Sequence, residues 1–160
     1  MIRLAHTKDA FQIAQVHVES WYETYKSIVR EEILEQLSVD QKMSIWEIVI
    51  DDPHQAVFVY EEHGRILGFA DFYFAPNAEI GELRAIYLLN EIHGRGVGSA
   101  LMQQGFKLFK ERNYKLINVE VFDRNSSRFF YEKLEAYLVG EENADDYGDG
   151  LNILKYQWLI

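Results

Sequence analysis

Cysteine is absent from the 160 residues of this chain, and proline occurs only twice. Without cysteine the protein has no disulfide bonds, no thiolate zinc site and no covalent intermediate on a cysteine. No apolar run approaches the roughly 20 residues of a membrane-spanning helix, and His6, Lys8 and Asp9 interrupt the N-terminus where a secretory signal would be apolar. We therefore expect a cytoplasmic protein without a membrane partner.

Positive charge is scarce as well. There are 16 lysines and arginines against 26 aspartates and glutamates, which gives a net charge of −10. This charge repels nucleic acid and attracts cations, although acidic residues serve solubility equally well. We expect no nucleic-acid partner, and charge alone names no substrate.

Paired metal ligands are also missing. The histidines have no spacing typical of a metal site and occupy scattered positions, His6, His17, His54, His63 and His93. We predict no metal site.

Hydrophobic residues make up 48% of the chain, enough for one domain over residues 1–160 with a sizeable core. No internal repeat or linker divides it. A strand is predicted at residues 2–4, followed by a helix with Thr7 as its N-cap. That helix carries a stripe at helical spacing that predicts a core face, formed by Phe11, Ala14, Val18, Trp21 and Tyr25.

The remaining elements alternate between helices and strands. Ser38 with Gln41 predicts the start of a helix through Trp46, and His63-Gly64 predicts a hairpin turn between strands at 56–61 and 66–74. Further strands are expected at residues 82–89, 116–122, 137–141 and 152–160, with helices up to residue 112 and over 126–134. The polar segment 143–150 is a predicted loop. This order predicts a mixed α/β fold.

Three glycines open one of these helices. Gly94, Gly96 and Gly98 lack Cβ atoms, so the backbone can turn sharply and present N–H groups at a helix N-terminus, where the helix dipole favours an anion. Arg95 adds a full positive charge. The loop therefore predicts a site for a phosphate or diphosphate group.

Two common phosphate loops fit this sequence poorly. A nucleotide triphosphate P-loop requires Lys followed by Ser or Thr, whereas Ser99 and Ala100 follow the last glycine. A dinucleotide fingerprint requires a glycine at the position of Ser99 and a strand directly before the loop, but residues 90–93 intervene.

A third reading covers far more of the chain. The run from His93 to Gly98 resembles the Gln/Arg-x-x-Gly-x-Gly/Ala loop of the GNAT superfamily of acyl-CoA-dependent N-acyltransferases, with His93 in place of Gln or Arg. Residues 123–134 independently resemble the Asn-x-x-small-x-x-Phe-Tyr-x-Lys-Leu helix of that family. Features of the first 59 residues are also similar to small bacterial members, so the resemblance spans nearly the whole chain.

The resemblance implies a central, mostly antiparallel sheet with a splayed parallel strand pair, flanked by helices. It implies acetyl-CoA as the cofactor, with its pantetheine arm along the backbone of Ile86, Tyr87 and Leu88 and a hydrogen bond from Asn125. Asn125 is equally well placed as a helix N-cap. The diphosphate is expected at the loop, formed by His93, Gly94, Arg95, Gly96, Val97, Gly98 and Ser99.

Two residues are implied as catalytic. The Tyr131 phenol is expected to protonate the departing CoA thiolate, although an aromatic residue here also suits packing. Glu82 is expected as the base for the attacking amine, the alternative being a strand carboxylate paired with Arg84. A backbone N–H near Leu88 would polarise the acetyl carbonyl.

The implied reaction is direct transfer of acetyl to a primary amine of a small molecule or peptide in a ternary complex. Trp21, Tyr22 and Tyr25 are expected to contact the acceptor, which aromatic and acidic neighbours suit if it is cationic. The alternatives are a silent acyl-CoA-binding or regulatory module, or an acetyltransferase for protein lysines or N-termini. An exposed late strand would also permit a homodimer.

The match has two local departures. The family commonly continues with Gly-Phe after the second helix, whereas this chain has Glu135-Ala136-Tyr137, which predicts a different or a strained helix exit. Glu91 places negative charge near the loop and would weaken CoA binding.

Overall fold

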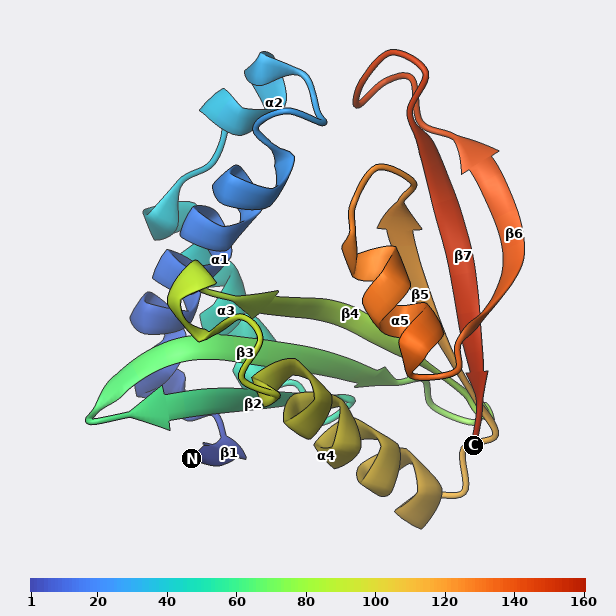
Figure 1. The fold of residues 1–160 in the computed structure, drawn as a ribbon. Helices are drawn as coiled ribbons and strands as arrows, with labels where there is room; N and C mark the ends of the chain where they lie inside the picture. The colour runs from blue at the N-terminus through green and yellow to red at the C-terminus, as the bar shows by residue number, and fades with distance from the viewer.

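The computed structural model describes all residues from Met1 to Ile160 as a single seven-stranded sheet with helices on both faces (Figure 1). The strand order is β1-β2-β3-β4-β5-β7-β6, and every neighbouring pair is antiparallel except β4 and β5. The strands are β1 (Ile2–Leu4), β2 (Gln55–Glu62), β3 (Arg65–Phe74), β4 (Ile80–Leu88), β5 (Leu116–Phe122), β6 (Tyr137–Asn143) and β7 (Asn152–Leu159). The α/β fold with one parallel pair is therefore confirmed.

The helices are α1 (Ala10–Tyr25), α2 (Glu31–Glu35), α3 (Val39–Asp51), α4 (Val97–Glu111) and α5 (Ser127–Lys133), with 3-10 turns η1 (Thr7–Asp9) and η2 (Asn90–Ile92). As predicted, Ser38 caps α3 by accepting a hydrogen bond from the Gln41 N–H at 3.3 Å. His63 and Gly64 form the predicted hairpin turn, both with positive φ, at 52° and 79°. None of the helices is long and apolar enough to cross a bilayer.

The parallel pair β4–β5 separates soon after it begins. Backbone pairing joins only Ile80–Glu82 to Leu116–Asn118; beyond that point β4 pairs with β3 alone, and β5 pairs with β7 alone. A β-bulge shifts the β3–β4 register by placing Arg84 between the partners of Asp71 and Phe72. Figure 1 shows the two strands diverging. The edge of β4 from Leu83 onward thus carries backbone groups without a strand partner.

Aromatic residues on β3 build the core on both faces of the sheet. Phe69 packs edge-on against Trp46 of α3 at 5.0 Å, whereas Phe72 faces α4 and packs against Phe109 at 6.0 Å. A Cβ on Gly105 of α4 would lie 2.3 Å from the Phe72 ring, so only glycine admits this close approach. Alternating residues of β3 therefore face opposite helix layers.

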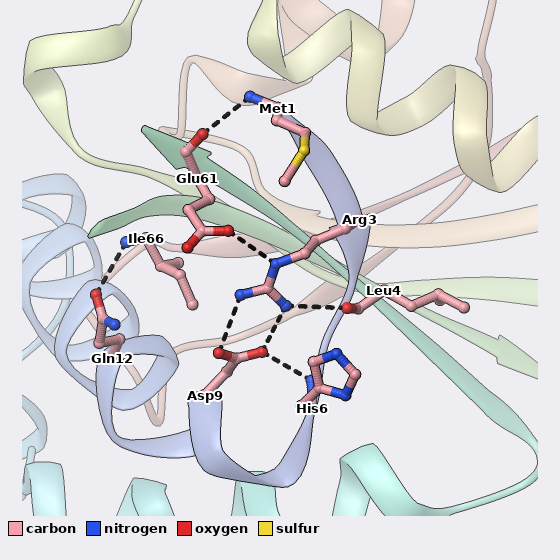
Figure 2. Close-up of polar contacts among 8 residues, drawn as sticks. All are labelled: Met1, Arg3, Leu4, His6, Asp9, Gln12, Glu61 and Ile66. Carbon is pink, nitrogen blue, oxygen red and sulfur yellow. Dashed lines mark hydrogen bonds and ion pairs between the residues drawn. The ribbon is translucent and has the colours of Figure 1, made fainter. Parts of the chain in front are cut away.

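The start of α1 differs from the prediction. Thr7 is not an N-cap, because the 3-10 turn η1 precedes α1 and the His6 N–H donates to the Asp9 carboxylate at 2.7 Å (Figure 2). Arg3 binds Asp9 and Glu61 at 2.8 Å each and so fastens this turn to β1 and β2. Hydrogen bonding from Arg3 lowers the pKa of Asp9.

The predicted core stripe of α1 is correct only in part. Ala14 and Tyr25 are buried, but Phe11 is 45% exposed, and Val18 and Trp21 are half-buried. The helix buries a neighbouring set of positions, namely Ala10, Ile13, Ala14, Val16 and Ser20. Spacing alone did not show on which side of the helix the sheet would lie.

Candidate active site

A cavity of about 610 Å³ lies where β4 and β5 diverge. Its walls come from β4, the glycine loop, β5, the start of α5 and the last two turns of α1. Most of the residues predicted for the site line it, namely Ile86, Tyr87, Leu88, His93, Gly94, Gly96, Val97, Gly98, Ser99, Asn125, Tyr131 and Tyr25. One cavity thus joins segments that are far apart in the sequence.

The glycine loop leads into α4 through two left-handed residues. Gly94 has φ of 76°, and Gly96, the N-cap of α4, has φ of 79°. A Cβ added at either position would meet no atom within 4 Å, so the space beside the loop is open. Open space beside N–H groups at a helix N-terminus suits a diphosphate group. The residues present therefore fit the phosphate end of a CoA molecule.

The two residues flanking Gly94 hold the loop in place. The His93 imidazole forms a hydrogen bond with the Leu88 carbonyl at 2.9 Å, which ties the loop to the end of β4. Arg95 extends to β2, where it binds Glu62 at 2.5 Å, and it does not line the cavity. The hydrogen bond from Arg95 lowers the pKa of Glu62 to about 2. The Glu91 carboxylate is paired with Arg65 at 2.9 Å.

Asn125 joins the start of α5 to the end of α1. Its side-chain oxygen accepts a hydrogen bond from the Ser127 N–H at 2.9 Å, and its amide nitrogen donates to the Tyr25 phenol oxygen at 2.9 Å. The residue is buried and lines the cavity. Asn125 is not the N-cap of α5, because Ser126 holds that position; its contact with the Ser127 N–H is an Asx turn just before the helix.

Three phenols meet near this point. Burial raises the pKa of Tyr131, Tyr87 and Tyr25, and the proximity of Tyr25 raises the first two further. The Tyr131 ring packs edge-on against Trp158 of β7 at 5.6 Å. All three phenols therefore stay protonated at neutral pH. The sequence reasoning used only the backbone of Tyr87 and did not anticipate that its side chain would join this group.

Glu82 lies apart from the phenols. Its carboxylate, nearly half exposed, accepts a hydrogen bond from Arg84 at 3.0 Å. It lines a second, neighbouring cavity of about 450 Å³ together with Asn118 and Gln157. The structure thus shows the Arg84 pair that was the alternative reading of this residue.

The predicted acceptor residues divide between two positions. Tyr25 lines the main cavity, and Trp21 packs against it with ring centroids 4.3 Å apart and ring planes tilted by 46°. Tyr22 is 48% exposed. Two polar residues of α1 that the sequence reasoning did not single out, Ser20 and Thr24, also line the cavity. Because they are four residues apart, they lie on the same face of α1. The sequence could have indicated both residues only if the buried face of this helix had been known.

Comparisons with known proteins agree with this geometry. Residues 13–136 match the Acetyltransferase (GNAT) family. The chain is 32% identical over 161 residues to the uncharacterized N-acetyltransferase YuaI of Bacillus subtilis, an alignment that covers 98% of this chain and 91% of the relative.

Solved structures show the same fold. The PaiA N-acetyltransferase from Thermoplasma acidophilum in complex with coenzyme A superposes with a TM-score of 0.80 at 22% identity, covering 99% of this chain and 98% of that one. A ribosomal-protein-alanine N-acetyltransferase from Brucella melitensis reaches 0.78 at 18% identity, covering 100% and 99%.

A sheet opened between β4 and β5, with a glycine loop at the N-terminus of α4, defines an acyl-CoA-dependent acyltransferase. The chain belongs to the GNAT family and is an acetyl-CoA-dependent N-acetyltransferase.

Proposed function

We propose that this protein transfers the acetyl group of acetyl-CoA to a primary amine of a small molecule or peptide, by direct attack in a ternary complex. The observation that carries the proposal is the single cavity that runs from the glycine loop, along the unpaired edge of β4, to Asn125 and Tyr131. An extended ligand along that edge satisfies backbone groups that a strand would otherwise bind.

Different parts of the cavity bind different parts of acetyl-CoA in this proposal. His93 to Ser99 hold the diphosphate through their N–H groups, and the backbone of Ile86, Tyr87 and Leu88 binds the pantetheine arm. Arg95 contributes only its backbone N–H, because its guanidinium is paired with Glu62 and does not line the cavity. The Asn125 amide uses one N–H on Tyr25, and its other N–H is the proposed donor to the arm. When bound, acetyl-CoA supplies a thioester that is activated toward an amine.

Tyr131 is the proposed proton donor to the departing sulfur. Its buried, protonated phenol lines the cavity, as this role requires. A backbone N–H near Leu88 polarises the carbonyl oxygen, an effect of about 3 kcal/mol in other enzymes. A base must also remove a proton from the attacking amine, and Glu82 at the start of β4, with its carboxylate held by Arg84, is one candidate for it.

The acceptor enters from the side of α1. Tyr25 forms the wall of the cavity there, backed by Trp21, while Tyr22 stands at the exposed rim. Aromatic faces on a protein with a net charge of −10 suit a cationic amine.

An edge strand supports a homodimer. β6 ends the sheet, and three successive exposed apolar side chains, Tyr137, Leu138 and Val139, lie on it. Such an edge is open to pairing with a second copy. Light scattering of the purified protein tests this by its mass, which a dimer doubles.

The activity is tested by following thiol release from acetyl-CoA with a panel of primary amines, free and in peptides. We expect release that depends on one class of free amine or peptide. CoA binding without turnover of any amine would instead show a silent binding module, and modification confined to lysines or N-termini of intact proteins would show a protein acetyltransferase.

A further inference from the structure

Asp71 of β3 is a buried carboxylic acid that the mechanism above does not use. It is 3% exposed, and its Oδ1 atom has no hydrogen-bond partner. An unpaired buried polar atom costs about 1–3 kcal/mol, and more when it is charged. Other acidic residues of the sheet do have partners, since Glu62 and Glu82 each form an ion pair with an arginine.

Asp71 does not line the main cavity, but its partner on the neighbouring strand does. It pairs in register with Ala85 of β4, and directly paired residues of neighbouring strands point their side chains to the same face. Ala85 lines the main cavity. The carboxyl group therefore lies on the strand next to the cavity wall, beside the bulge formed by Arg84.

The groups around Asp71 leave its charge only partly balanced. The Arg84 guanidinium lies over the Tyr73 ring, 3.7 Å from its centroid, and is bound to Glu82 rather than to Asp71. Asp52 at the end of α3 adds a second negative charge. Farther along the same face, His17 of α1 accepts a hydrogen bond from Trp46 and stacks on Tyr87, the next residue on this face after Ala85.

Burial raises the pKa of Asp71 to about 7; Arg84 opposes the rise, and Asp52 adds to it. A carboxyl group in this range exchanges protons near neutral pH, as a general base must. Burial likewise lowers the pKa of His17 to about 4, so the imidazole is neutral and contributes no competing charge.

We propose that Asp71 accepts, through one water molecule beside Ala85, the proton that the acceptor amine must lose before it attacks. This inference rests on the proposed function, because it assigns a base for acetyl transfer to an amine. Asp71 would act on the acceptor side of the sheet, the side on which α1 lies.

The proton balance closes with the groups already described. Through the water molecule, Asp71 takes one proton from the ammonium and frees the nitrogen lone pair. The nitrogen forms a bond to the carbonyl carbon, and the carbon–sulfur bond breaks. Tyr131 gives its proton to the sulfur, and the second proton lost by the nitrogen restores the phenol. The proton on Asp71 then returns to solvent.

The test compares three variants over a pH series, using the amine that the wild type acetylates best. Asp71→Asn should lower kcat/KM at pH 7 by about 10²-fold or more and abolish the acidic limb of the profile. Glu82→Gln should keep that limb. Asp52→Asn, at the end of α3 and outside both cavities, should keep the activity and move the limb to lower pH.

A second readout does not depend on turnover. In protein labelled with ¹³C at aspartate carboxyls, the Asp71 signal, assigned by its loss in Asp71→Asn, should titrate near pH 7. It should also shift when that amine is added to the CoA complex. A midpoint near pH 4, or a normal acidic limb in Asp71→Asn, would overturn the inference while leaving the proposed function intact. If the wild type acetylates no amine, the proposed function fails, and the inference fails with it.

Discussion

The side-chain amide of Asn125 donates a hydrogen bond to the phenol oxygen of Tyr25 across 100 positions of sequence, at 2.9 Å. This contact joins the helix expected to bind the cofactor to the helix expected to face the acceptor. We therefore expect the two residues to be coupled energetically.

The first prediction concerns this pair. Tyr25→Phe leaves a buried amide N–H without its partner and should cost about 1–3 kcal/mol of unfolding free energy. Asn125→Ala should cost a similar amount, because it also removes the interaction with the Ser127 N–H. Urea denaturation of the single and double variants measures both. Costs that simply add in the double variant would show that the two residues are not coupled.

Tyr131→Phe tests the proposed proton donor. The substitution keeps the packing against Trp158 but removes the acidic proton, so kcat should fall about 10²-fold or more while the Kd for CoA stays the same. Tyr137→Phe, on the exposed edge strand β6, serves as the control and should keep full activity. Equal rates for the two variants would assign Tyr131 to packing alone.

The exit of α5 provides a stability test. Glu135 is left-handed with φ of 75°, and the N–H groups of Glu135 and Ala136 bind the carbonyls of Glu132 and Tyr131. A non-glycine residue in this conformation costs about 1 kcal/mol, so Glu135→Gly should stabilise the protein by about that much. Asn113 ends α4 with φ of 63°, and asparagine tolerates this region better. Asn113→Gly should therefore gain less; a larger gain there would contradict the explanation.

The pH dependence of stability should reveal the buried acid. The pKa of Asp71 is raised to about 7 from an ordinary value near 4, so the unfolded chain loses this proton first as the pH rises. Its contribution to stability is complete below pH 4 and is lost between about pH 4 and pH 7. Asp71→Asn should match the wild type at pH 4 and exceed it at pH 8 by up to about 4 kcal/mol, at about 1.4 kcal/mol for each pKa unit.

The reference in that measurement must be the wild type at the same pH. His17 acts in the opposite direction, because its lowered pKa of about 4 makes its contribution disappear as the pH falls from about 6.5. Subtracting the unfolding free energy of the wild type from that of Asp71→Asn at each pH removes the His17 contribution, which is the same in both proteins. A difference that does not change with pH would mean that Asp71 titrates at its ordinary value.

Local patterns in the sequence were sufficient for much of the fold. The turn at His63-Gly64, the cap at Ser38 and the strained exit at Glu135 follow from backbone preferences within a few residues, and the structure shows all three. The open glycine loop was predicted for the same reason, since Gly94 and Gly96 take conformations that other residues rarely adopt.

Relationships across strands were not predictable in this way. In the sequence, Asp71 is simply an acidic residue within an apolar strand. Its place beside the cavity wall follows only from its pairing with Ala85 and from the bulge at Arg84. Phe11 fitted a helical stripe but faces solvent, because the position of the sheet, and not the spacing, decides which side of a helix is buried. Arg95 suited a phosphate contact by sequence, yet it reaches to Glu62 on a distant strand.

The central claim, that the turn from Gly94 to Gly98 holds the diphosphate of CoA, is tested most directly by CoA titration of two matched glycine variants. Gly96→Ala and Gly64→Ala replace residues with the same φ of 79° and with no atom within 4 Å of the new methyl group, so both should lose about 1–2 kcal/mol of stability. By calorimetry, Gly96→Ala should bind CoA at least 10-fold more weakly than the wild type, and Gly64→Ala should bind it unchanged. Equal CoA affinity in both variants would contradict the account.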